Sequence, residues 1–81
     1  MTESRAMNFL QKNIAILLTA RGMTQKQLAD RAGMAPSNLN RIMHGSEKVT
    51  IQRAERIAEA FGVTLSDLLD ENLQNLVAVP A

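Results

Sequence analysis

The chain has 81 residues, which fits one small domain, and 46% of them are hydrophobic, which argues against disorder. It contains no cysteine and one histidine, so disulfides, thiolate zinc sites and multi-histidine metal sites are excluded, and we expect neither a metal nor another cofactor. The net charge is only +1, but all nine basic residues precede residue 57 while residues 57–81 carry four acidic ones, an asymmetry that suggests one face toward a polyanion.

The first predicted helix covers residues 7–20. Its apolar residues recur at helical spacing and form a stripe made of Leu10, Ile14, Leu17 and Leu18. Gly22 is expected to end this helix.

The second predicted helix begins after Thr24. The residues TQKQ fit a capping box, in which Thr24 is the N-cap and Gln27 reaches back to it. Leu28 and Ala29 are expected to point inward. Gly33 follows the end of the helix near residue 32 and supplies a backbone conformation that other residues resist.

The third predicted helix covers residues 36–44. Pro36 suits the first helical turn, where its missing N–H costs nothing, and Gly45 closes the helix. With about 100° per residue, one side of this helix is apolar and the opposite side is polar without a carboxylate. The apolar side is Leu39, Ile42 and Met43, and the polar side is Ser37, Asn40, Arg41 and His44.

Two further helices are predicted, and no strand. The fourth runs from a Thr50 cap through Phe61, with Ile51, Ala54, Ile57, Ala58 and Phe61 facing inward. The fifth starts at Thr64, where TLSD resembles a capping box, and its apolar face is Leu65, Leu68 and Leu69. Leu73, Leu76 and Val77 keep the helical spacing, which leaves an extension of this helix open.

Two short helices joined by a connection that contains Gly33 are the signature of a helix-turn-helix. The stretch MTQKQLADRAGMAPSNLNRIMHG, followed by AERIAEAFGVTLSDLL, resembles the phage repressor and Cro-like (XRE-type) helix-turn-helix family of bacterial transcription regulators. The resemblance covers about residues 8–70. It implies a single all-α, compact five-helix lambda-repressor-like DNA-binding domain, with a core at about 7–70 and a tail at 71–81, whose third helix lies in the major groove.

The polar side of the third helix supplies the candidate base-reading residues. Arg41 suits a bidentate contact to guanine, although a phosphate contact stays open, and Asn40 suits adenine or a water-bridged contact. Ser37 lies in the first turn, where it can reach a base or a phosphate. Pro36 stands where well-known members of the family carry a base-reading Gln, and it can offer only apolar contact.

Other residues are candidates for the DNA backbone. Gln25 matches the family position at which an amide side chain and a helix N-terminus hold a phosphate. The remaining backbone candidates are Thr24, Lys26, Asn38, His44, Ser46, Lys48 and Thr50.

Besides Pro36, the chain departs from the family pattern at Leu18 and Met43. Many members hold a buried Arg–Glu pair at these two positions. Because both partners are apolar here, no charge is left unpaired, and such a replacement is often neutral or stabilising. We expect Leu18 and Met43 to be in contact.

The sequence therefore predicts a cytoplasmic, sequence-specific regulator of double-stranded DNA that represses transcription by occupying an operator. Without an aromatic stacking platform, no RNA or single-strand partner is expected, and no apolar run reaches the roughly 18 residues of a membrane span. One module makes few contacts, so a homodimer is expected. Its hypothetical surface is Leu65, Leu69, Leu73, Leu76 and Val77.

Two other functional classes compete with this interpretation. An antitoxin-type or other protein-interaction module can use the same fold. An enzyme is not expected, because the chain lacks a cysteine nucleophile and a phosphate-cradling glycine-rich loop.

Overall fold

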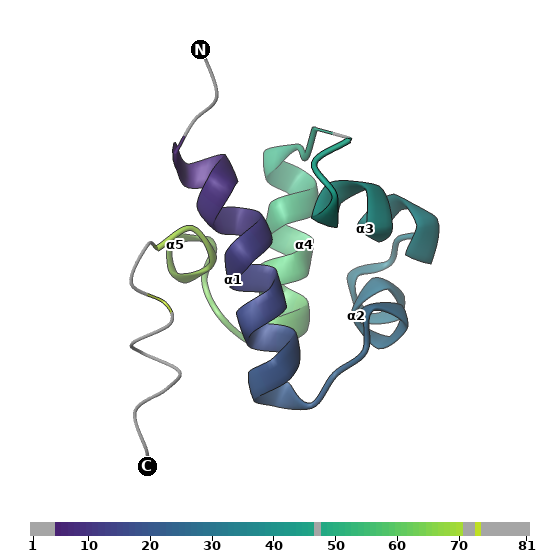
Figure 1. Cartoon of the computed structure of the whole chain (residues 1–81). Coiled ribbons are helices and arrows are strands. Elements are labelled where there is room, and N and C mark those ends of the chain that lie inside the picture. The colour runs from purple at the N-terminus through teal and green to yellow at the C-terminus, as the bar shows by residue number, and fades with distance from the viewer. Residues whose placement is uncertain (1–4, 47, 71–72, 74–81) are drawn as a thin grey trace.

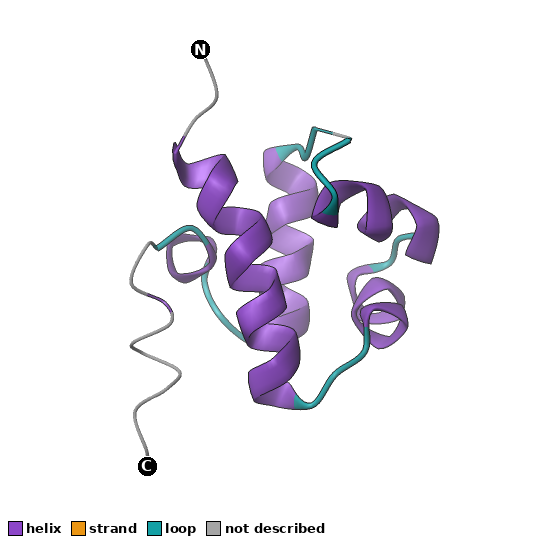
Figure 2. Cartoon of the chain, in the orientation of Figure 1, coloured by secondary structure: helices purple, strands orange, loops and turns teal. Residues whose placement is uncertain are grey.

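The computed structural model of the protein describes residues 5–46, 48–70 and 73. All the regular structure within these residues is helical, which confirms the all-α prediction (Figures 1 and 2). The helices are α1 (Arg5–Arg21), α2 (Gln25–Ala32), α3 (Pro36–Met43), α4 (Ile51–Phe61) and α5 (Leu65–Leu68).

Threonine caps fix where three of the helices begin. Thr24, Thr50 and Thr64 have extended backbones, and each hydroxyl accepts a hydrogen bond from the backbone N–H three residues later, at 3.0–3.1 Å. The capping boxes predicted at α2 and α5 are both present. The third helix begins differently, with Pro36 in its first turn and no side-chain cap, as the sequence indicated.

The core lies where the apolar faces of all five helices meet. In Figure 1, α1 and α4 form the centre, α2 and α3 lie on one side of them, and α5 lies on the other. The most deeply buried aliphatic side chains are Leu10, Ile14, Leu17, Leu28, Leu39, Ile42, Ile57 and Leu68. Leu18 and Met43 both pack half-buried against this core, and their direct contact stays a prediction.

Ile51 contradicts the prediction that it faces the core, because 71% of its surface is exposed. It is the first residue of α4, so the helical spacing places it in line with buried Ala54 and Ala58 but beyond the end of the core. It lies instead on the rim of a small groove of about 50 Å³, which is lined by Leu10, Val49, Thr50, Ile51, Ala54, Leu65 and Leu69.

The extension of α5 that the sequence left open is not continuous, because the helix ends at Leu68. In a continuing helix the Leu68 carbonyl would accept a hydrogen bond from the next turn. Here the Asn13 side chain of α1 donates to it at 2.7 Å, and to the Asp70 carbonyl at 2.8 Å. Leu73 is nevertheless buried, with 2% of its surface exposed, whereas Leu76 and Val77 lie outside the described residues.

Candidate nucleic-acid interface

A tight turn sets the angle between α2 and α3. Each helix has eight residues, and residues 33–35 join them. Gly33 adopts the left-handed conformation, with φ at 71°, which a side chain would strain. The Met34 N–H then closes the end of α2 by donating to the Ala29 carbonyl at 3.0 Å. Leu28 and Ala29 from α2, and Leu39 and Ile42 from α3, are buried together in the core.

Burying Leu39 and Ile42 turns the opposite side of α3 outward. The four predicted base-reading residues, Pro36, Ser37, Asn40 and Arg41, are all exposed. Asn38, predicted to contact the DNA backbone, is half-buried at the flank. The helix contains no acidic residue, so nothing on its outer face would repel phosphate. The structure thus brings the predicted reading residues onto one exposed surface.

Polar contacts close the C-terminal end of α3. The ring nitrogen Nδ1 of His44 lies 2.8 Å from the Asn40 carbonyl oxygen, and the Ser46 hydroxyl donates to the Arg41 carbonyl at 3.3 Å. These two predicted DNA-backbone residues therefore each use one polar atom within the protein. If Nδ1 carries the single proton of the neutral His44 ring, Nε2 has none to donate. Nε2 can then donate a hydrogen bond to a phosphate only in the cationic ring, in which both nitrogens carry a proton.

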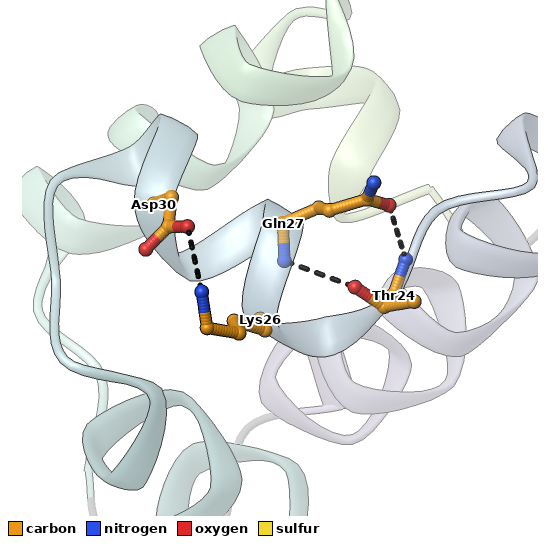
Figure 3. A network of polar contacts seen from close by, with 4 residues as sticks. All are labelled: Thr24, Lys26, Gln27 and Asp30. Carbon is orange, nitrogen blue, oxygen red and sulfur yellow. Dashed lines mark hydrogen bonds and ion pairs between the residues drawn. The ribbon is translucent and has the colours of Figure 1, made fainter.

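The N-terminus of α2 holds three of the predicted backbone residues. Figure 3 shows the capping box there, in which Thr24 and Gln27 exchange hydrogen bonds of 3.0 and 3.1 Å. Gln25 is the half-buried first residue of the helix. Lys26 forms an ion pair of 3.6 Å with Asp30, but the two side chains are 77% and 62% exposed. Exposed pairs contribute at most about 1 kcal/mol, so Lys26 can exchange Asp30 for a phosphate.

The N-terminus of α4 supplies the other predicted backbone contacts. Thr50 is exposed while its hydroxyl caps the helix by accepting from the Arg53 N–H at 3.1 Å. A hydroxyl that accepts a hydrogen bond can still donate its own proton. Lys48 is exposed in the preceding loop. This helix end can thus offer a hydroxyl and an ammonium group to an anion.

Sequence reasoning missed two polar residues of α1 that hold other helices. Asn13 is 1% exposed and contacts the end of α5, and Gln11 donates from Nε2 to the Ile42 carbonyl of α3 at 3.1 Å. A signal was present for Asn13. It lies three residues after Leu10 and four before Leu17, which places it within the apolar stripe.

The described residues give no support for two other kinds of site, a metal centre and a membrane span. Among them, no three potential metal ligands gather in one place. None of the helices in the described part of the chain is long and apolar enough to cross a membrane.

Comparison with known proteins identifies the family to which the helices α2 and α3 belong. A family model described as helix-turn-helix matches residues 14–68, which include α2, the turn and α3. Control protein C.BamHI of Bacillus amyloliquefaciens is 33% identical to this chain over 70 residues, which cover 86% of each protein. No solved structure matches the chain.

Proposed function

Since the chain belongs to the helix-turn-helix family of the phage repressor and Cro type, and is a DNA-binding transcriptional regulator, we propose that it is a cytoplasmic repressor that inserts α3 into the major groove of its operator. The observation that carries the proposal is the outer face of α3, which is polar, exposed and free of carboxylates while Leu39 and Ile42 anchor its inner face.

The base-reading role falls to three side chains of that face. Arg41 is assigned a bidentate contact to guanine O6 and N7, and Asn40 a contact to adenine. Ser37, in the first turn, reaches the neighbouring base or phosphate. Pro36 adds apolar contact, such as with a thymine methyl group, and contributes no hydrogen bond.

Phosphates are held at two helix N-termini that flank this face. At α2, the positive N-terminal end of the helix combines with Thr24, Gln25 and Lys26. At α4, Lys48 and Thr50 occupy the corresponding place. Asn38, His44 and Ser46 contact the backbone beside α3. These contacts orient the protein on DNA without distinguishing sequences.

The repressor acts as a homodimer on a two-part operator, because one α3 reads too few base pairs for selective binding. The surface proposed for the dimer combines Leu65 and Leu69, both half-buried beside the groove, with exposed Ile51. Leu73 is already buried and contributes to the fold of α5 and its surroundings, so it has little surface left for a partner. Leu76 and Val77 keep their proposed dimer role, outside the described residues.

Selection of bound duplexes from a random pool tests the function. We expect enrichment of a symmetric sequence whose half-sites lie about one helical turn, 10–10.5 base pairs, apart. Binding to the selected duplex should weaken steeply as the salt concentration rises. A pool that stays random after repeated rounds, at low salt as well as high, would contradict sequence-specific binding. Repression would then be tested with the selected duplex placed over a promoter in a purified transcription reaction.

A further inference from the structure

The last turn of α3 has a contact from α1 whose function the groove-reading model does not explain. Gln11, half-buried on α1, donates from Nε2 to the backbone carbonyl of Ile42 at 3.1 Å. The two residues are 31 positions apart, so this hydrogen bond joins separate helices. It also ends directly beside Asn40 and Arg41, the residues proposed to read bases.

This hydrogen bond is not needed to satisfy the Ile42 carbonyl. The same oxygen accepts from the Gly45 N–H, also at 3.1 Å. A carbonyl oxygen has two lone pairs, so removing Gln11 would leave it with one partner. The expected loss of stability is therefore small. The consequence of the Gln11 contact that matters here is the direction that it gives to the C-terminal end of α3.

The carboxamide of Gln11 also lies close to the turn that follows α3. A Cβ atom built on Gly45 would lie 3.1 Å from Gln11 Nε2, so the amide lies against the bare backbone of the turn that follows α3. Gly45 has φ at 75°, which turns the chain sharply at this point. Met43, in the same last turn, packs half-buried against the core, and such an apolar contact does not fix a direction as a hydrogen bond does.

We propose that Gln11 is a positioning residue for DNA recognition. By fixing the last turn of α3 against α1, it sets the angle at which Asn40 and Arg41 meet the base edges. Hydrogen bonds to bases depend strongly on this angle, whereas phosphate contacts tolerate small rotations. The inference rests on the proposed function. It concerns a residue that precedes positions 14–68 matched by the family model.

Three substitutions at position 11 separate positioning from packing. Gln11→Met keeps the length of the side chain and removes the donor. Gln11→Lys keeps a donor, and its positive charge suits the C-terminal end of a helix. Gln11→Glu keeps the shape but replaces the donor by a negative charge that faces carbonyl oxygens. Thr19→Met, at an exposed position about two turns further along α1, is the matched control.

The readout is the ratio of affinities for the selected operator and for random duplex, measured well below the unfolding temperature. Gln11→Met should lower this ratio about three- to tenfold, which corresponds to the net free energy of one hydrogen bond. The affinity for random duplex should stay nearly unchanged. Gln11→Glu should lower it further, and Gln11→Lys should restore it. Selection with Gln11→Met should flatten base preferences opposite Asn40 and Arg41 more than those opposite Ser37.

Amide hydrogen exchange of the free protein gives a measurement that does not depend on DNA. Gln11→Met should speed exchange at residues 43–46, and Thr19→Met should not. Unchanged exchange together with an unchanged affinity ratio would overturn the role of Gln11 while leaving the proposed function intact. Failure of the unaltered protein to select any sequence would instead refute the proposed function. If Gln11→Met does not fold, a ratio for Gln11→Lys as low as that for Gln11→Glu would equally overturn the role.

Discussion

Replacing Asn13 by leucine tests whether a single buried amide holds α5 against α1. The Asn13 side chain is 1% exposed, and its Nδ2 donates to two backbone carbonyls, at 2.7 Å to Leu68 and at 2.8 Å to Asp70. Leucine has a similar size but no donor. The substitution therefore keeps most of the packing and removes both hydrogen bonds.

The two lost hydrogen bonds have different costs. The one to Leu68 is buried, and leaving a buried carbonyl without this donor costs about 1–3 kcal/mol. The Asp70 carbonyl keeps a second partner, the Leu73 N–H at 3.2 Å, so only the net value of a hydrogen bond, about 0.5–1.5 kcal/mol, is lost there. Together the two losses amount to about 1.5–4.5 kcal/mol. At about 0.05–0.15 kcal/mol per residue, a domain of this size is stable by only about 4–12 kcal/mol, so the expected effect is a large part of the total.

Urea unfolding followed by circular dichroism measures this change. The urea midpoint should fall with little change in slope, and the thermal midpoint should fall by about 6–36 °C, at about 4–8 °C per kcal/mol for a domain this small. Lys12→Leu, at the exposed neighbouring position, should stay within about 0.5 kcal/mol of the unaltered protein. A loss below about 0.5 kcal/mol for Asn13→Leu would refute the reasoning, because the amide would then be no better than an apolar side chain.

Three further substitutions test the interface. Arg41→Ala should lose about 1–3 kcal/mol of binding free energy in a titration and relax the preference at one base pair, whereas equal weakening on every sequence would identify a phosphate contact. Gln25→Ala should weaken binding to selected and random duplexes alike, and unchanged binding to both would remove Gln25 from the interface. Ile51→Asp should raise the dimer dissociation constant at least about tenfold in sedimentation, with Ile51→Ala intermediate; equal dimerisation of all three proteins would place the dimer surface elsewhere.

Local sequence signals predicted where the helices begin and which side of α3 is exposed. Thr24, Thr50 and Thr64 mark helix starts because a capping hydroxyl acts on N–H groups only a few residues away. The exposed face of α3 follows from helical spacing once Leu39 and Ile42 are recognised as buried. Both kinds of inference use interactions within one helix, so no knowledge of the tertiary structure is required.

The sequence could not predict features that depend on how far the core extends or on distant partners. Ile51 has the spacing of a core residue, but spacing cannot show that the core ends before the first residue of α4. Gln11 and Asn13 act on carbonyl groups 31, 55 and 57 residues away, and the backbone offers carbonyls everywhere. The tight packing of α1 between α3 and α5 selects among them, which only the folded chain can show.

Two of the acidic residues that follow residue 56 lie on the side of the fold away from α2 and α3. Asp67 and Asp70 lie at α5 and its end, and in Figure 1 this element is separated from α2 and α3 by the α1–α4 pair. Packed helices are about 8–10 Å apart, so two such steps place these carboxylates roughly 16–20 Å from the reading face. That is about twice the Debye length of about 8 Å at physiological ionic strength. These two carboxylates therefore oppose DNA binding very little at that ionic strength. At low salt, where screening extends over about 30 Å, they repel the duplex from their own side of the molecule and so favour its approach to α3.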